Sequence, residues 1–260
     1  MRSHLLVALA CAGLGACSAG HLQPRAPTPG KPHLTVMTYN VNYGIACDEP
    51  TTEAIEKSGA DAVFLQETTP QWEACLRDRL SATWPHMAFH HGPGAGGMAV
   101  LSKLAFDDKE SIPSPIGWFP GWRVVLHAPL GDVQVLQVHL RPQVSDSGSY
   151  VSGYFSTGHY RKAEIEQYAP TLDPSIPALV AGDFNEQNGA AIRHLRDQGL
   201  RDVLEDFKLG PTWRWPTALG TLRMKLDHMF YSTRLSPIDA RVLEAGRSDH
   251  LPVIAVFEGV

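Results

Sequence analysis

Residues 178–185 read Ala-Leu-Val-Ala-Gly-Asp-Phe-Asn. Leu179 to Ala181 predict a short buried strand, because the run is apolar on both faces. Asp183 and Asn185 follow one residue apart. Since alternate residues of an extended chain point to the same side, both side chains can converge beyond the strand end while Phe184 turns into the core. The stretch could seat a water and an oxyanion, and it also fits an ordinary turn.

Polar side chains follow other apolar runs in the same way. These further candidates are Asn40, Glu67, His139, Asp227, and Asp249 with His250. Each has a structural alternative, because an Asn or Glu at a strand end can cap a turn or helix, and a His on a strand is more often structural. Randomly placed polar residues would not recur at strand ends, so we expect one shared site.

The order of elements indicates an α/β protein with mixed sheets. Strands at 34–40 and 62–65 alternate with helical segments, the clearest at 71–80, which suggests α/β layering. Tight connections at 92–97 and 129–132 predict antiparallel hairpins. The Gly-rich connection at 92–97 lacks the Gly-Lys-Ser/Thr ending of a phosphate-binding loop and precedes a strand, not a helix.

Composition bounds the class of protein. The 260 residues suit one generous domain or two small ones, and a 43% hydrophobic share with 19% charged residues is typical of globular chains. The formal net charge of -5 argues against extensive binding of duplex DNA, which needs Lys and Arg to neutralise phosphates. One local phosphate site remains compatible with it.

The N-terminus predicts export. Residues 1–16 combine Arg2 with a short apolar run, and Leu14-Gly-Ala-Cys17 resembles a bacterial lipoprotein signal in which Cys17 is acylated. A plain secretory signal is the alternative. Residues 17–32 are rich in Pro and Gly and predict a surface tether, with a single domain over 33–260. We expect a cell-envelope, periplasmic or secreted protein, anchored to the membrane if Cys17 carries lipid.

Two cysteines remain in the predicted domain. Cys47 and Cys75 both lie near the start of predicted helices that follow strands. Outside the cytoplasm such leftover thiols often pair, so we predict a disulfide, with two free thiols as the alternative.

Seven segments, in this order, carry a family resemblance: Thr-Tyr-Asn40, Leu-Gln-Glu67, Gly97-Met-Ala-Val-Leu-Ser102, Val-His139-Leu, Gly182-Asp-Phe-Asn185, Leu-Asp227-His and Ser248-Asp-His-Leu-Pro252. Over residues 34–258 the chain resembles the endonuclease/exonuclease/phosphatase superfamily. The resemblance implies the DNase I-like fold, an α/β (α+β) four-layered sandwich of two packed mixed β-sheets flanked by helices. It also implies metal-dependent hydrolysis of phosphodiesters or phosphomonoesters.

The resemblance assigns metal ligands. Glu67 would be the principal protein ligand to Mg²⁺ (or Mn²⁺), with Asn40 close by and Asp249 helping directly or through water. Oxygen donors and retained waters are what Mg²⁺ prefers. Related abasic-site endonucleases have an acidic residue two positions after the Asn that matches Asn40, where this chain has Asn42.

The resemblance also assigns catalytic residues. His250, paired with Asp227, would stabilise the pentacovalent state or transfer a proton. Asp183 would position or deprotonate the attacking water. Asn185 would donate to a non-bridging oxygen, and His139 to the scissile phosphate. Many relatives have Thr or Asn before that histidine, whereas this chain has a valine.

Candidate substrate-binding residues follow His139 along the chain. Arg141 ends that strand, and a tyrosine from the long segment 144–159 or its end would contact substrate, as in one branch of the family. The candidates are Tyr150, Tyr154 and Tyr160. Long loops in compact domains tend to be functional.

Aromatic residues also gather near Pro and Gly. Trp118, Phe119, Trp122, Trp213 and Trp215 could stack on a substrate, touch lipid or pack loops onto the core.

The sequence therefore predicts a secreted or lipid-anchored, metal-dependent phosphoesterase, expected to be a monomer. Nucleic acid, phospholipid head groups such as sphingomyelin, and small phosphate esters compete as substrates. A catalytically silent binding protein would have lost Glu67, Asp183 or His250, and all three are present. A serine hydrolase would need a Gly-x-Ser-x-Gly elbow between a strand and a helix, and residues 147–153 offer no such context.

Overall fold

The computed structural model describes residues 21–145, 148–149, 152–153, 156–218 and 220–260. Its α-helices are α1 (Glu49–Glu56), α2 (Pro70–Leu80), α4 (Gly158–Tyr168), α5 (Ala190–Asp197) and α6 (Val203–Asp206). Its strands are β1 (His33–Asn40), β2 (Ala62–Gln66), β3 (His86–His90), β4 (Met98–Ser102), β5 (Phe106–Ile112), β6 (Gly121–Ala128), β7 (Gly131–His139), β8 (Ala178–Asp183), β9 (Arg201–Asp202), β10 (Trp213–Thr217), β11 (Gly220–Met224), β12 (Asp227–Tyr231), β13 (Leu235–Val242) and β14 (Val253–Gly259).

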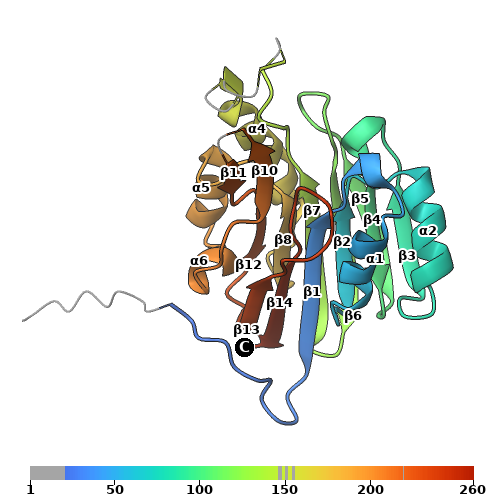
Figure 1. Cartoon of the computed structure of the whole chain (residues 1–260). Coiled ribbons are helices and arrows are strands. Elements are labelled where there is room, and N and C mark those ends of the chain that lie inside the picture. Colours follow the sequence, from blue (N-terminus) through green and yellow to red (C-terminus); the bar gives the residue numbers. More distant parts are fainter. Residues whose placement is uncertain (1–20, 146–147, 150–151, 154–155, 219) are drawn as a thin grey trace, which may run out of the picture.

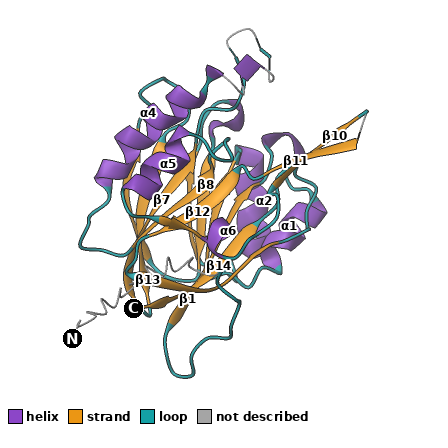
Figure 2. Ribbon diagram, turned by 90° about the vertical axis from the view of Figure 1, so that its left-hand side faces the viewer, coloured by secondary structure: helices purple, strands orange, loops and turns teal. Residues whose placement is uncertain are grey.

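Two mixed six-stranded sheets pack face to face (Figure 1). One has the order β13-β14-β1-β2-β4-β3, and the other has the order β5-β6-β7-β8-β12-β9. Helices α1 and α2 cover the outside of the first sheet, and α4 and α5 cover the outside of the second (Figures 1 and 2). The predicted four-layered sandwich is confirmed, including the antiparallel pairs β3–β4 and β6–β7.

The period-two alternation of each strand divides the apolar side chains between the layers. In β1, Leu34 and Val36 face the core between the sheets, whereas Met37 and Tyr39 pack under the helices of the first sheet. All four are fully buried. Residues 178–185 follow the same alternation. Leu179 and Ala181 of β8 face the core between the sheets, while Val180 and Phe184 pack under α4 and α5.

Strand β8, which forms most of residues 178–185, lies at the centre of its sheet and ends at Asp183. It pairs in parallel with β7, placing His139 beside Asp183, and antiparallel with β12, placing Asp227 beside Asp183. Gly182 has a φ of 147°, and a Cβ there would lie 1.8 Å from the Val138 carbonyl oxygen. A glycine is therefore required at position 182 for β7 and β8 to approach each other this closely.

Two further predictions concern the N-terminal half. The predicted signal, residues 1–16, and Cys17 lie outside the described residues. Of the predicted tether, the part that is described lies against the domain: the Leu22 N–H donates to the Asp206 carbonyl (2.7 Å), and Arg25 and Thr28 bind the Glu258 carboxylate. No helix in the described ranges is long and apolar enough to cross a membrane.

A disulfide joins Cys47 to Cys75, with their Cα atoms 5.7 Å apart. It links the turn before α1 to the body of α2, so it cross-links the two helices that cover the first sheet. Cys75 is buried, and Cys47 adopts a φ of 65°.

Candidate active site

The predicted site residues meet at one mouth of the sandwich, between the two sheets. Asn40 and Asp183 end β1 and β8 on the faces that look toward the opposite sheet, following the inward side chains Val36 and Ala181. The Asn40 Nδ2 donates to Asp183 Oδ2 at 3.1 Å, so this bond spans the two sheets. Alternation along the strands thus delivers polar ends to the place where the apolar core stops.

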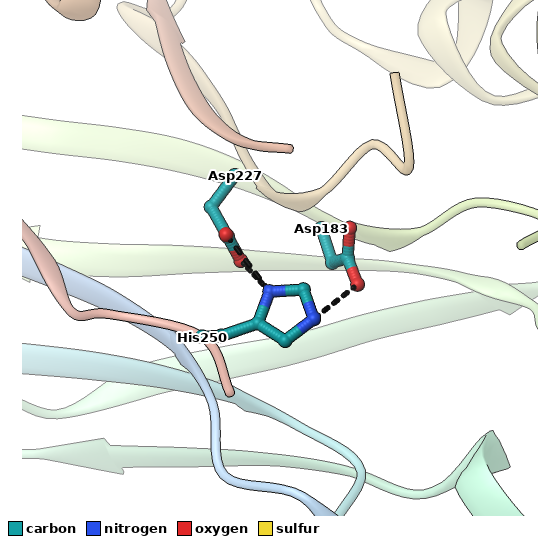
Figure 3. Close-up of side chains that lie close together, drawn as sticks. All are labelled: Asp183, Asp227 and His250. Atoms are coloured by element: carbon teal, nitrogen blue, oxygen red, sulfur yellow. Dashed lines mark hydrogen bonds and ion pairs between the residues drawn. The ribbon is translucent and has the colours of Figure 1, made fainter. Parts of the chain in front are cut away.

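His250 is held between two carboxylates (Figure 3). Its Nδ1 lies 2.9 Å from Asp227 Oδ2, and its Nε2 lies 3.6 Å from Asp183 Oδ2. The three residues are at most 6% exposed. Burial alone would lower the pKa of His250, but Asp227 and Asp183 raise that pKa to about 10. His250 is therefore an imidazolium at neutral pH.

Short hydrogen bonds fix the backbone around this group. The Thr212 hydroxyl accepts from the Leu226 and Asp227 N–H groups at 2.9 Å each. The Ser248 hydroxyl donates to the Asn40 carbonyl at 2.7 Å and accepts from the His250 N–H at 3.1 Å. Ser248 thus ties the end of β1 to the histidine, which preorganises the site.

Asp183 is buried among these groups, and burial raises its pKa, opposed by the nearby His250. Its Oδ1 accepts from the Asn185 N–H at 2.8 Å, so the Asp-Phe-Asn turn holds the carboxylate in place. Asn185 has a φ of 51°, and its Nδ2 donates to the Leu140 carbonyl at 3.0 Å. The simple strand alternation expected for Asp183 and Asn185 therefore gives way to a left-handed residue. One amide hydrogen of Asn185 is used structurally, which leaves the second for a ligand.

Glu67 follows β2 in a left-handed conformation, with a φ of 63°. Its Oε1 accepts from Asn40 Nδ2 at 2.9 Å, and its Oε2 accepts from the Tyr43 N–H at 3.1 Å. Burial raises the pKa of its carboxyl. The alternative role as a helix cap is wrong, because the Thr69 hydroxyl caps α2.

Asp249 lies beside this group, held by two neutral donors. Asn42 Nδ2 donates to its Oδ1 at 3.0 Å, and Trp213 Nε1 donates to its Oδ2 at 2.9 Å. Asn42, where related enzymes carry an acidic residue, thus orients Asp249. An amide serves that purpose because it can donate to a carboxylate, whereas an acidic side chain would repel it.

His139 is buried at the end of β7. Its Nε2 lies 3.6 Å from Asp183 Oδ2 and 4.0 Å from Glu67 Oε1, and its ring stacks on Phe119 with the ring centroids 4.2 Å apart. Burial is the largest influence and lowers the pKa of His139 to about 4. The two histidines therefore differ in charge at neutral pH, with His139 neutral and His250 cationic.

The predicted substrate-binding residues lie on the His139 side of the mouth. The Arg141 guanidinium lies 4.1 Å from the centroid of the Tyr160 ring and 5.2 Å from that of Trp118. The structure thus brings Arg141 and Tyr160 together. Tyr150 and Tyr154 lie outside the described residues.

The chemistry of the site fits a divalent cation. Asp183, Asp227 and His250 offer ligand atoms within 4.8 Å of one another, and Glu67 and Asn40 contact Asp183 through the Asn40 amide. The donors are mostly carboxylate oxygens, which Mg²⁺ and Mn²⁺ prefer, and a cation would offset their mutual repulsion. Because His250 Nδ1 is engaged by Asp227, the side of the site that could hold a cation is the one with Glu67.

Four positioning contacts were not predicted from the sequence. Thr212, Ser248, Phe119 and Trp213 each contact a site residue, as described above. Ser248 begins the Ser-Asp-His segment, and Phe119 and Trp213 belong to the aromatic residues near Pro and Gly, but the sequence did not indicate what they touch. Thr212 carries no local signal, because only tertiary packing brings it to the site.

The Endonuclease/Exonuclease/phosphatase family matches residues 37–250. No curated protein matches the chain. An endonuclease/exonuclease/phosphatase from Beutenbergia cavernae DSM 12333 superposes with a TM-score of 0.69 at 22% identity, covering 88% of this chain and 72% of that chain.

Two further solved structures share the fold. TDP2 of D. rerio, complexed with single strand DNA product, gives a TM-score of 0.68 at 18% identity and covers 86% of this chain and 98% of that chain. The human Nocturnin catalytic domain with bound sulfate anion gives a TM-score of 0.63 at 17% identity and covers 88% of this chain and 96% of that chain. At such identities the likeness establishes the fold, and the family match over residues 37–250 establishes the relationship. The chain belongs to the endonuclease/exonuclease/phosphatase family.

Proposed function

We propose that this protein is a divalent-metal-dependent hydrolase of phosphodiester bonds. The observation that carries the proposal is the line Asp227–His250–Asp183 across the mouth of the sandwich, with Asn40 and Glu67 on the far side of Asp183. The buried cationic His250, the buried carboxylate of Asp183 and the proposed metal ligand Glu67 thus lie around one small volume. Each can contribute to hydrolysis of a phosphate ester, by stabilising developing negative charge, by accepting a proton from water and by holding a metal ion.

The residues divide the work by charge. Asp183 positions a water and accepts its proton, a role that its raised pKa favours. His250, kept protonated by Asp227, places positive charge against the phosphate as negative charge develops. His139, neutral at pH 7, donates a hydrogen bond without adding charge. The second amide hydrogen of Asn185 serves a non-bridging oxygen.

Glu67 would hold Mg²⁺ or Mn²⁺, with Asn40 and Asp249 beside it. When bound, the ion screens the phosphate charge and stabilises the leaving oxygen. The Tyr43 N–H and the Asn40 amide hold the Glu67 carboxylate in one orientation, so the ligand is preorganised.

Export belongs to the same proposal. The Leu14-Gly-Ala-Cys17 segment supports cleavage before Cys17 and a lipid anchor, and the Cys47–Cys75 disulfide supports an oxidising compartment. We propose a monomer in the cell envelope. A sphingomyelinase-like or small phosphate-ester activity is the second candidate, because the same site would serve any accessible phosphoester.

A substrate screen tests the proposal. The chain from residue 21 is assayed on a chromogenic phosphodiester and, in parallel, on plasmid DNA, RNA, sphingomyelin and phosphomonoesters, with Mg²⁺ or Mn²⁺ and with a chelator. We expect phosphodiester hydrolysis that stops on chelation and falls sharply in His250→Ala and Asp183→Asn. Undiminished activity in both variants would overturn the mechanism, and no hydrolysis of any ester would overturn the function.

A further inference from the structure

The β10–β11 hairpin is a two-stranded ribbon whose two faces differ in chemistry. Its register pairs Trp213 with Met224 and Trp215 with Leu222, and alternation puts these four side chains on one face. The intervening pairs, Arg214 with Arg223 and Pro216 with Thr221, occupy the other face. One face is therefore apolar and aromatic, and the other is cationic. Figure 2 shows the ribbon projecting from the body.

The apolar face is joined to the catalytic centre. Trp213 Nε1 donates to Asp249 Oδ2 at 2.9 Å, and Trp213 forms an antiparallel bridge with His250. The Trp215 ring stacks on that of Trp213, with the centroids 6.1 Å apart and the planes within 9°. The aromatic face thus begins at the catalytic residues and extends outward by one ring.

The outer part of this face is open to solvent. Trp215 is 52% exposed, and its cross-strand partner Leu222 is 51% exposed. Five large hydrophobic side chains are exposed among the described residues, and the two other aromatic ones also adjoin the site. Tyr43 donates its N–H to Glu67, and Trp118 packs against Phe119, which stacks on His139. The exposed aromatic residues Trp215, Trp118 and Tyr43 therefore all belong to segments next to the site.

The cationic face holds the ribbon in this orientation. Arg214 NH2 donates to the Gly246 carbonyl at 3.0 Å, and Arg214 and Arg223 each lie 3.4 Å from a Glu244 carboxylate oxygen. The Arg214 N–H also donates to the Asp249 carbonyl at 2.8 Å. These contacts fix the root of the ribbon on the protein, so its aromatic face stays turned to the active site.

We propose that Trp215 and Leu222 form a subsite for an unpaired nucleobase next to the scissile phosphate, which makes single-stranded nucleic acid the substrate class. This inference rests on the proposed function and adds the substrate to it. A planar base stacks on an indole without regard to sequence, and a free strand offers bases that a duplex hides. The net charge of -5 is consistent with a site that gains affinity from stacking more than from phosphate neutralisation. A bilayer fits less well, since the aromatic face is turned to the catalytic residues and the opposite face carries arginines.

Binding measured without catalysis tests the inference. The full exported chain carrying Cys17→Ser, which removes the predicted lipid, is titrated in chelator with a labelled 12-nucleotide oligothymidine and with the same strand made of abasic residues. We expect Trp215→Ala to weaken oligothymidine binding about tenfold and Trp215→Phe to restore most of it. Neither variant should change binding of the abasic strand. The matched control is Thr221→Ala, an exposed position on the opposite face, which should bind as the parent does.

The outcomes separate the two proposals. The subsite is overturned if the parent and Trp215→Ala bind oligothymidine equally well. It is also overturned if Trp215→Ala loses as much affinity for the abasic strand as for oligothymidine. Trp215-dependent sedimentation with phosphatidylglycerol vesicles, without an effect on oligothymidine, also overturns it in favour of a lipid contact. Absence of hydrolysis with retained Trp215-dependent base binding overturns the phosphoesterase function and leaves the subsite standing.

Discussion

Asp227 Oδ2 lies 2.9 Å from His250 Nδ1, although Asp227 begins β12 of one sheet and His250 precedes β14 of the other. The contact therefore forms only when the two sheets pack together. It fixes the orientation of the histidine, and with Asp183 it keeps the pKa of His250 near 10, despite burial that acts in the opposite direction.

Asp227→Asn is expected to lower kcat for a phosphodiester about 10²- to 10⁴-fold, because the amide can neither hold the imidazolium nor compensate its charge. Steady-state kinetics and urea unfolding measure the two effects separately. The matched control is Asp202→Asn, which alters another buried Asp–His pair, Asp202 with His228 at 2.7 Å. Asp202→Asn should cost stability and spare kcat, and equal kcat losses in both variants would contradict a catalytic role for Asp227.

Glu67→Gln is expected to raise the Mg²⁺ concentration for half-maximal activity by at least tenfold, because it removes the charged ligand atom. The Gln keeps an oxygen for the Asn40 amide or the Tyr43 N–H, so folding should survive. Metal titrations of activity, with calorimetric titration of Mn²⁺, measure the change. The control is Glu73→Gln, a partly exposed position on α2 whose carboxylate pairs with Arg77. An unchanged metal requirement in Glu67→Gln would place the ion elsewhere.

The Cys47–Cys75 disulfide closes a loop with a sequence separation of 28. Chain entropy predicts that its loss lowers the free energy of unfolding by about 3.5 kcal/mol. Urea unfolding of the chain from residue 21, oxidised and reduced, measures the difference, and a Cys47→Ser/Cys75→Ser variant should match the reduced protein. Thiol titration of the unreduced, denatured chain should find no free thiol. Two free thiols would contradict the pairing.

Glu164 of α4 is fully buried, and it accepts from the Ser114 hydroxyl at 2.9 Å and from the Arg141 N–H at 2.8 Å. Burial raises the pKa of its carboxyl to about 7. The folded state therefore binds more protons than the unfolded state between about pH 4.3 and pH 7, so this carboxyl makes stability fall as pH rises through that window.

Glu164→Gln removes this titration and can keep both hydrogen bonds, since its amide can donate to Ser114 and accept from Arg141. Relative to the parent, we expect the variant to gain on the order of 2 kcal/mol in free energy of unfolding between pH 5 and pH 8. Urea unfolding at both pH values measures the gain. Glu166→Gln, an exposed position on the same helix, should show no comparable gain. Parallel pH profiles of Glu164→Gln and the parent would contradict the raised pKa.

The sequence by itself determined the layers and the strand ends. Runs such as Leu179 to Ala181 are too apolar for any place but a sheet interior, and their period of two requires that Asp183 share the inward side of the strand. The seven ordered segments indicated the family, and thereby the roles expected of Asn40, Glu67 and His250. The fold and the family were predicted correctly because each segment is a pattern of residues close in sequence, whereas the roles of Asn40, Glu67 and His250 stay predictions.

Tertiary structure alone decided how the strand ends meet. No local pattern predicts that Asn40 donates a hydrogen bond to Asp183 across the two sheets, or that the Thr212 hydroxyl accepts from the Asp227 N–H. Nor does a local pattern predict that Asn185, in its left-handed turn, donates one amide hydrogen to the Leu140 carbonyl. The charges of the two histidines also required it. His139 ends β7 and His250 precedes β14, and both are buried. For His139 burial outweighs the nearby carboxylate and the ring is neutral, whereas for His250 the contact with Asp227 and Asp183 outweighs burial and the ring is cationic. This difference depends on the packing of distant segments.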